Sequence, residues 1–343
     1  MGILRSGGGI ELVESYENFN PNKFDKIYIS KVFDFTKIDE SLLTLPNVHY
    51  GGTGFFFDKA TPLPYEIEHH MPDYHLYDEY IAHDTKHTKK SYWKEYGNYS
   101  IGFATRGCFR QCQFCVNQNY KKVEFNAHIS EFYDPETKGI ILLDDNIFGY
   151  NKWKDVFDEL AETNKPFIFK QGMDIRLLND LKAQVLARCK YMNEFIFAFD
   201  NVDDEMIITR KLELLRKYTN RNTKLYVLCG FKGQGGDEID GIFKRIEILS
   251  KYKCLPYIMR HKNYLGTPYE GMFKLIARWC NQPSLFKKLS LYEFVSADEK
   301  NIKTKDYVCS SRRYIQKFEN DYPEIAEKWF NKRFWTDVEN AQI

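Results

Sequence analysis

The chain has 343 residues, of which 43% are hydrophobic and 16% aromatic, enough for one large folded domain or two smaller ones. Its 49 Lys and Arg nearly balance 48 Asp and Glu, and a net charge of +1 excludes attraction of nucleic acid or anionic lipid by a strong overall field. No apolar run reaches the roughly 18 to 20 residues that span a bilayer, and the N-terminus lacks the apolar core of a signal peptide. We therefore expect a soluble, cytoplasmic protein.

Residues 1–95 read as a short α/β segment followed by a connector. IYISKVF at 27–33 predicts a strand, and VHYGGTGF from 48 predicts a second strand that ends at a glycine turn. GGTG lacks the GlyLysSer or GlyLysThr ending of a phosphate-binding loop, so a plain turn is the better interpretation. LPYEIEHHMPDYHLYDEY follows as a proline-punctuated connector.

The connector is rich in histidine. Five of the eight histidines fall here among several carboxylates, at His69, His70, His75, His83 and His87. Such a density could bind a metal ion, but the spacings match no known ligand motif, and a polar connector is the better interpretation. Residues 86–93, with three lysines, Tyr92 and Trp93, could touch a phosphate or a base, although a solvated loop is favoured.

Strand and helix patterns alternate between residues 96 and 262. Short β-branched or aromatic runs start at 101, 140, 167, 195, 225 and 255, and helical spacing separates them, as at 153–160 and 239–249. Apolar strands joined by helices predict a parallel sheet with right-handed crossovers. Six such units fit a partial (β/α)₆ barrel, about three quarters of a complete (β/α)₈ barrel. Residues 263–343 are mainly helical in pattern and predict a helical cap.

Three cysteines lie on the loop that leaves the first of these strands, at the end where α/β folds place their chemistry. Cys108, Cys112 and Cys115 form CxxxCxxC. A structural zinc site needs four ligands, and no second pair follows; a zinc site completed by a distant residue remains the alternative. A four-iron four-sulfur (4Fe–4S) cluster can take three thiolates and keep one iron open for a small chelating cofactor. The isolated Cys189, Cys229, Cys254, Cys280 and Cys309 read as small buried hydrophobes.

This pattern resembles the radical S-adenosylmethionine (SAM) superfamily, and Phe114 before the third cysteine also fits it. The resemblance covers residues 100 to 260. It implies a 4Fe–4S cluster whose open iron binds SAM, reductive cleavage of the sulfonium, a 5′-deoxyadenosyl radical that abstracts hydrogen, and an electron donor such as a flavodoxin or ferredoxin. The substrate stays open among peptides, small metabolites and nucleotides.

The same resemblance implies cofactor contacts from the carboxyl ends of later strands. After the second strand, Asp144, Asp145 and Asn146 resemble the group that contacts the methionyl amine of SAM, whose ammonium needs acceptors. The remaining candidates are Gln171 and Arg176 after the third strand, Asp200 for the ribose after the fourth, and Gly230 near the adenosyl part after the fifth. A solvated turn or a helix cap is the alternative for the AspAspAsn segment, and ordinary loop polarity is the alternative for Gln171, Arg176 and Asp200.

Residues 25 to 80 also resemble the end of the cobalamin-binding domain that one radical SAM branch carries at its N-terminus. The family's AspxHisxxGly pattern is replaced here by AspTyrHisLeuTyrAsp at 73–78, and fewer than 100 residues precede the barrel pattern. We therefore expect a truncated domain that does not bind cobalamin. Two alternatives to a radical SAM enzyme of unknown substrate stay open: a cobalamin-dependent radical SAM methyltransferase, and a non-catalytic metal-binding protein on the same barrel.

Overall fold

The structure is a computed structural model of the chain, and it describes residues 2–4, 10–12, 19–59, 61, 63–76, 78–83, 97–300 and 310–337. The chain forms two compact units. Unit 1 contains Met1–His70 and Arg110–Lys121, and unit 2 contains Met71–Phe109 and Lys122–Ile343. The predicted divisions at 95/96 and 262/263 stay predictions. Residues 86–93, His87 and Cys309 lie outside the described ranges.

Unit 1 is built on a small mixed sheet with the strand order β2-β1-β3-β4. Its strands are β1 (Gly2–Leu4), β2 (Ile10–Leu12), β3 (Lys26–Ser30) and β4 (Val48–Gly51). β1 pairs antiparallel with β2 and β3, and β3 pairs parallel with β4. The two strands predicted in this segment are thus confirmed as β3 and β4. Short helices surround the sheet: η1 (Pro21–Lys23), η2 (Glu40–Thr44), α1 (Thr53–Phe56), η3 (Phe57–Lys59) and α2 (Tyr65–Glu68).

Unit 1 has a small hydrophobic core of its own. Phe24, Ile27, Ile29 and Leu42 are buried together. After β4 the chain turns at Gly52, whose φ of +100° belongs to the left-handed region. A Cβ there would lie 2.5 Å from the carbonyl oxygen of Lys31, so only glycine fits. The GGTG stretch is therefore a backbone turn packed against the end of β3.

Unit 2 contains six parallel strands in two three-stranded sheets, ordered β5-β8-β9 and β10-β11-β12. The strands are β5 (Tyr99–Gly102), β8 (Gly139–Leu142), β9 (Phe167–Phe169), β10 (Phe195–Ala198), β11 (Thr223–Cys229) and β12 (Cys254–Arg260). A parallel bridge between Met173 and Phe197 connects the segment after β9 to β10. All six predicted strands are present, in chain order across the two sheets. The described strands form no closed barrel.

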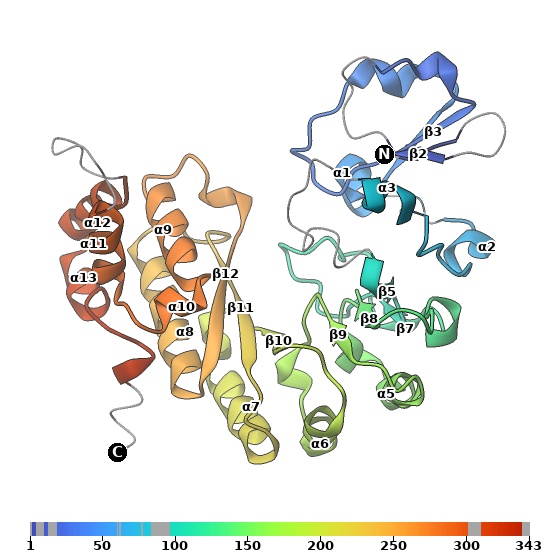
Figure 1. Ribbon diagram of the computed structural model, residues 1–343. Coiled ribbons are helices and arrows are strands. Elements are labelled where there is room, and N and C mark those ends of the chain that lie inside the picture. Colours follow the sequence, from blue (N-terminus) through green and yellow to red (C-terminus); the bar gives the residue numbers. More distant parts are fainter. Residues whose placement is uncertain are drawn as a thin grey trace. The chain divides into compact units, whose positions relative to one another are not determined.

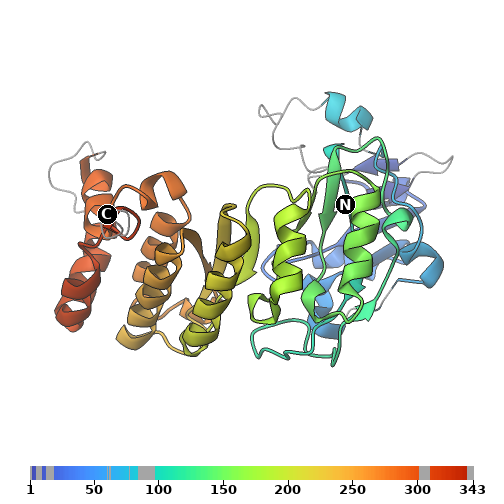
Figure 2. The same cartoon turned by 90° about the horizontal axis from the view of Figure 1, so that it is seen from below.

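Helices of unit 2 follow the strands along one side. They are α5 (Trp153–Glu162), α6 (Asp180–Arg188), α7 (Glu205–Tyr218) and α8 (Gly236–Lys251). Figure 1 shows α5, α6 and α7 along the same side of the strands, and Figure 2 shows these helices and α8 side by side in chain order. The helices predicted at 153–160 and 239–249 are α5 and α8. Unit 2 is thus a mixed α/β unit with parallel sheets.

Several shorter elements complete unit 2. A two-stranded antiparallel ribbon pairs β6 (Thr105–Arg106) with β7 (Glu124–Phe125). Further elements are α3 (Asp78–His83), η4 (Ile129–Glu131), η5 (Ile147–Gly149), η6 (Ile175–Leu177), η7 (Val202–Asp204) and η8 (Lys262–Tyr264). The predicted helical C-terminal region forms α9 (Glu270–Cys280), α10 (Pro283–Phe286), α11 (Leu291–Lys300), α12 (Ser310–Asp321) and α13 (Pro323–Trp329).

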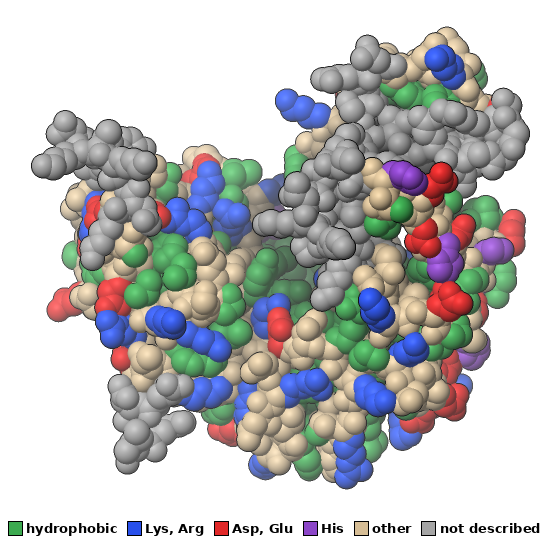
Figure 3. Space-filling model, in the orientation of Figure 1, with side chains coloured by type: hydrophobic (Ala, Val, Ile, Leu, Met, Phe, Trp, Pro, Cys, Tyr) green, Lys and Arg blue, Asp and Glu red, His purple; other side chains and the backbone are tan. Residues whose placement is uncertain are grey.

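One large hydrophobic core unites the strands, the helices that follow them and the C-terminal helices. β8 and β9 are buried at every position, whereas β11 alternates between buried and partly exposed residues. Trp279, Phe243 and Phe334 are fully buried and join α8, α9 and the C-terminal end of the described chain. On the face shown in Figure 3, both basic and acidic side chains lie on the surface of unit 2. Within the described ranges, no helix has both the length and the apolar character needed to cross a bilayer.

Candidate functional site

The carboxyl ends of the parallel strands carry the residues predicted to form a site. The chain leaves β5 through β6 and reaches Cys108 directly after Gly107, whose φ is +89°. After β8 it continues through Asp144, Asp145 and Asn146 into η5. These two segments, 38 to 40 residues apart in sequence, are held together by hydrogen bonds in which each of the three consecutive polar side chains takes part.

Asp144 holds the first part of the loop. Its Oδ1 accepts hydrogen bonds from the backbone N–H of Thr105 at 2.6 Å and from the Thr105 hydroxyl at 2.6 Å. Its Oδ2 accepts from the backbone N–H of Ala104 at 3.2 Å. Burial raises the pKa of Asp144 to about 6, although these hydrogen bonds lower it. With 1% of its surface exposed, Asp144 fixes the backbone of the loop, and its predicted contact with a cofactor stays a prediction.

Asp145 and Asn146 hold the part of the loop that contains the first cysteine. Asp145 Oδ2 accepts a hydrogen bond of 2.8 Å from the backbone N–H of Gly107. Asn146 Nδ2 donates to Sγ of Cys108 at 3.3 Å. The Oδ1 atom of Asn146 is buried and has no hydrogen-bond partner among the described residues. An orphaned buried acceptor is costly, and in native proteins it commonly marks a group that a ligand satisfies.

The other two cysteines belong to unit 1. Cys115 donates its backbone N–H to the carbonyl of Cys112 at 2.9 Å, which closes a turn between them. The Sγ of Cys115 accepts a hydrogen bond of 3.4 Å from the backbone N–H of Asn117. Phe114 lies within this turn and is partly buried. Sulfur atoms that accept hydrogen bonds are stabilised as thiolates, the form that binds iron.

The remaining described cysteines have a different environment. Cys229, Cys254 and Cys280 are buried, and Cys189 is half-buried. Burial raises the pKa of Cys189 and of Cys254 to about 11 and that of Cys229 to about 12, and it also raises the pKa of Cys280. These residues are held as neutral thiols, as the sequence predicted for isolated cysteines among apolar neighbours.

A second group of polar residues lies after β10 and β11. Asp200 follows β10, and burial raises its pKa to about 6 against the opposing effects of Arg245 and a hydrogen bond from the Leu228 backbone. Gly230 follows β11 with a φ of +71°, and a Cβ there would lie 2.7 Å from Cβ of Tyr264. The close neighbour of Gly230 in the structure is thus a tyrosine, and its predicted approach to the adenosyl part of SAM stays a prediction.

Arg245 organises this second group, and sequence reasoning missed it. It is 3% exposed on α8, and its Nη1 donates to the carbonyl oxygens of Phe199, Asp200 and Leu228 at 2.8 to 3.2 Å. Its Nη2 lies 3.8 Å from Oε1 of Glu238, which in turn accepts from the backbone N–H of Gly230 at 3.2 Å. One side chain therefore ties together the ends of two neighbouring strands.

Lys182 connects the two segments that follow β8 and β9. It is 8% exposed on α6, and its Nζ donates to the carbonyls of Phe148 at 2.9 Å and Leu177 at 3.1 Å. Burial is the main cause that lowers the pKa of its ammonium group. The sequence did contain a signal for both residues: Lys182 and Arg245 fall at positions where the helical period of their apolar neighbours places the core face.

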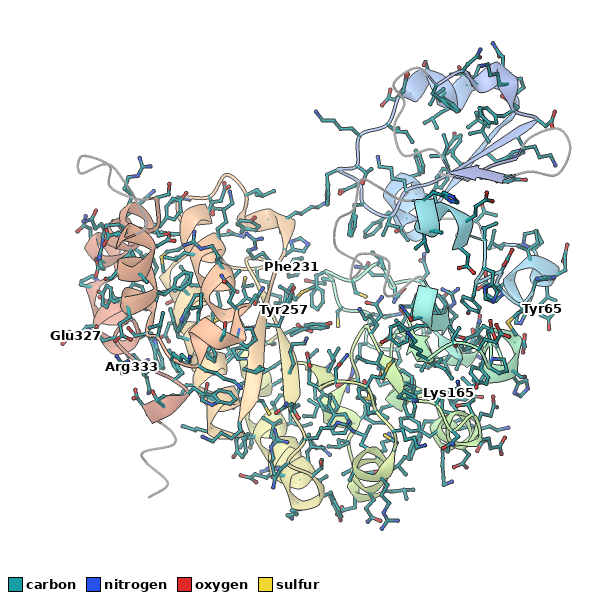
Figure 4. All side chains as sticks on the ribbon, viewed as in Figure 1. Tyr65, Lys165, Phe231, Tyr257, Glu327 and Arg333 are labelled. Atoms are coloured by element: carbon teal, nitrogen blue, oxygen red, sulfur yellow. The ribbon has the colours of Figure 1, made fainter. Side chains whose placement is uncertain are left out.

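Of the two candidates after β9, Arg176 lies near the second group, and its charge opposes the rise in the pKa of Asp200. Gln171 is exposed on the turn after β9. Arg176 donates from Nε to Oδ1 of Asp174 at 2.8 Å and from Nη1 to Oδ2 of Asp204 at 2.9 Å. The guanidinium of Arg176 is thus held by two carboxylates. In the sheet of β10, β11 and β12, Figure 4 labels Phe231 just beyond the carboxyl end of β11 and Tyr257 within β12.

No group of three His, Cys, Asp or Glu side chains within the described residues is arranged to hold a metal ion. The three clustered cysteines are divided between the units, Cys108 in unit 2 and the others in unit 1. His75 of the connector forms a hydrogen bond of 2.8 Å with Asp78. The ring of His75 therefore pairs with a carboxylate of the connector itself.

A scan against models of known protein families found no match to this chain. A search of curated proteins found no similar protein either.

Proposed function

We propose that the protein is a radical SAM enzyme whose 4Fe–4S cluster is held by Cys108, Cys112 and Cys115. The observation that carries this proposal is the attachment of the loop before Cys108 to the polar segment after β8. The carboxylates of Asp144 and Asp145 accept hydrogen bonds from the backbone between 104 and 107, and the amide of Asn146 donates to the Cys108 sulfur. A loop that only connects two strands needs no such support, whereas a metal ligand depends on it.

The order of the strands supports a partial (β/α)₆ barrel. In a doubly wound sheet the strand order reverses at a switch point and helices cover both faces. Here the order across the two sheets follows the chain from β5 to β12, and the helices lie along one side. This order supports the winding of a barrel, which would direct the chemistry to the loops after the strands.

The donor atoms fit an iron–sulfur cluster. The sulfur atoms of Cys108 and Cys115 accept hydrogen bonds, and hydrogen bonds to cluster sulfurs tune such centres. All three thiols are partly exposed, in contrast to the buried Cys229, Cys254 and Cys280. When bound, the cluster would supply the electron that cleaves the sulfonium bond of SAM.

The polar residues at the strand ends would bind and orient SAM. The unpartnered Oδ1 of Asn146 would accept a hydrogen bond from its ammonium group, and Asp145 would add negative charge beside it. Asp200 would accept from the ribose, and Gly230 would allow backbone approach to the adenosyl part. Asp144, Arg245 and Lys182 would act as positioning residues, since their polar atoms contact the backbone. Arg176, Gln171 and Phe114 remain candidates for further contacts.

Other parts of the proposal rest on the sequence alone: the electron donor on the resemblance, the location on the lack of a predicted signal peptide or membrane span, and the absence of cobalamin on the missing AspxHisxxGly pattern. A one-electron donor such as a flavodoxin or ferredoxin would reduce the cluster, the protein would act in the cytoplasm, and cobalamin would not bind. The substrate is a peptide, a small metabolite or a nucleotide.

Metal analysis tests the ligand set. After anaerobic reconstitution with iron and sulfide, we expect about four irons and four sulfides per chain. Replacement of any of the three clustered cysteines by alanine should lower the iron content severalfold, whereas Cys189→Ala should leave it unchanged. About one zinc per chain with no cluster would favour a non-catalytic metal-binding protein.

A further inference from the structure

A cavity of about 320 Å³ opens between α5 and α6 in unit 2, and the proposed function does not use it. Its volume is at the lower end of the range of small-ligand sites, roughly 300 to 1,000 Å³. The next helices along the chain pack on one another, α6 on α7 and α7 on α8, whereas α5 and α6 leave this space between them. The lining includes Phe167 at the start of β9 and Cys189 directly after α6. The cavity thus lies near the amino ends of the strands, opposite to the end that carries the candidate cofactor residues.

The walls of the cavity are mainly apolar. Five hydrocarbon side chains line it: Phe157, Leu160, Ala161, Phe167 and Val185. Phe157, Leu160 and Phe167 are buried members of the main core, so the cavity reaches the core between the two helices. A hydrocarbon chain placed here would be removed from water, which is the main source of affinity for apolar ligands.

The polar side chains of the lining that carry no positive charge already have partners. Asp158 pairs with Lys154 at 2.6 Å, and the side-chain oxygen of Asn164 accepts a hydrogen bond from Nζ of Lys190. The Sγ of Cys189 donates to a backbone carbonyl of α6 at 3.3 Å. A sugar or a nucleobase needs several hydrogen-bond partners on the walls of its site, and polar groups left unpaired are costly. The walls therefore favour a ligand with an apolar body.

Three cations line the same cavity, and their charge is not compensated. They are Lys165, which Figure 4 labels, Arg188 and Lys190. Lys165 donates to two backbone carbonyls at 2.8 and 2.9 Å and Lys190 donates to Asn164, but within the described ranges none of the three pairs with a carboxylate. The carboxyl ends of α5 and α6 each contribute about half a negative charge. Because Lys154 neutralises Asp158, roughly two positive charges remain for an anionic ligand.

Arg188 is the residue best suited to bind the anionic group. It is the last residue of α6 and is exposed, and its guanidinium forms no hydrogen bond with any other described residue. A guanidinium has five N–H donors in a planar fork that matches the two oxygens of a carboxylate. A carboxylate on Arg188 would also lie in the field of the neighbouring Lys190.

We propose that this cavity binds a small aliphatic carboxylate. Its chain lies between Phe157, Phe167 and Val185, and its carboxylate contacts Arg188 and Lys190. The apolar walls provide the affinity for the chain, and the uncompensated positive charge selects the carboxylate over an alcohol with the same chain. The site is separate from the proposed cofactor site, because its lining contains none of the residues assigned to the cluster or to SAM.

Calorimetric titration of the full chain with octanoate, 1-octanol and acetate tests this proposal. We expect octanoate to bind with a Kd on the order of 10 to 100 µM, 1-octanol to bind about tenfold more weakly, and acetate, which lacks the chain, to show no measurable binding. Arg188→Met should weaken octanoate binding about tenfold and leave 1-octanol binding unchanged, because it removes the charge and keeps an apolar side chain. Arg210→Met, at an exposed position on α7, should change neither.

Alkylation of Cys189 locates the bound chain. Octanoate should slow the reaction of Cys189 with N-ethylmaleimide several-fold, because this thiol lines the cavity, and it should leave the reaction of Cys115 unchanged. Absence of saturable octanoate binding, equal affinity for octanoate and 1-octanol, equal octanoate affinity of the Arg188→Met and Arg210→Met proteins, or an unprotected Cys189 would each overturn the proposal. Failure of cluster assembly would contradict the proposed function but not this site.

Discussion

Asn146 donates a hydrogen bond from Nδ2 to the Sγ of Cys108 at 3.3 Å, while its Oδ1 is buried without a hydrogen-bond partner among the described residues. One end of the amide thus contacts the first cysteine, and the other end is the atom that we propose binds SAM. A hydrogen bond to a sulfur atom favours the thiolate, and the thiolate is the reactive form.

Asn146→Leu should slow the alkylation of Cys108 by iodoacetamide. In a protein that also carries Cys112→Ser and Cys115→Ser, so that Cys108 is observed without them, we expect a decrease of roughly threefold to tenfold, because one hydrogen bond to the thiolate is lost. Mass spectrometry of the modified peptide measures the rate. Asn22→Leu, at an exposed position in unit 1, should have no effect. Equal rates in both variants would show that the amide does not stabilise the thiolate.

The native chain should show two classes of cysteine. At pH 8 we expect Cys229 and Cys254 to react about a hundredfold more slowly than the three clustered cysteines, because burial holds their pKa at about 12 and about 11. Timed alkylation followed by peptide mapping checks this. Rapid labelling of Cys254 in the folded protein would contradict the described core.

Because of Asp144, the free energy of unfolding should be larger in mild acid than at neutral pH. Its folded pKa is about 6, above the usual value of 3.8, so the folded state binds more protons than the unfolded state between these values. The free energy of unfolding should therefore fall as pH rises from about 4 to 6, by on the order of 2 to 3 kcal/mol from this residue. Asp200, whose pKa is raised to a similar value, should add a change of the same sign.

Urea unfolding at pH 4.5 and pH 7 measures this dependence. Asp144→Asn should reduce the difference between the two pH values, because the titrating group is gone. Asp158→Asn, which removes an exposed partner of Lys154, should keep the native difference. An unchanged pH dependence in Asp144→Asn would mean that this carboxylate is not buried as described.

Arg245→Met should destabilise unit 2. The change leaves three backbone carbonyls without their donor and Glu238 without its opposite charge, at a cost of about 3 to 5 kcal/mol. Chemical denaturation followed by circular dichroism measures the loss. Arg210→Met, at an exposed position on α7, is the control and should cost less than about 0.5 kcal/mol. Equal free energies of unfolding for the two variants would contradict our claim that Arg245 stabilises unit 2.

Periodicity in the sequence predicted the elements well, because strand and helix are decided by local apolar spacing. The runs at 167, 195 and 255 became β9, β10 and β12, and the AspAspAsn segment was correctly assigned to the end of a strand. The contacts of its three side chains could not be predicted. Asp144 reaches Thr105 across 39 positions, and only the pairing of β5 with β8 brings them together.

Buried cations were missed for a related reason. A lysine or arginine in an amphipathic helix is usually solvated, so Lys182 and Arg245 were not singled out. Their hydrogen-bond partners are backbone carbonyls near strand ends. Every residue has such a carbonyl, so the sequence does not show which ones accept these bonds. The division of the cysteines between two compact units was equally hidden, since their spacing suggests a single loop.

The release of 5′-deoxyadenosine from SAM tests the central claim most directly. Anaerobically reconstituted protein is reduced in the presence of SAM, and the product is quantified by chromatography beside the Cys112→Ala protein. Our account predicts deoxyadenosine from the native chain and none above background from the variant. A cluster that forms on the native chain but never cleaves SAM would contradict the account, as would equal product from both proteins.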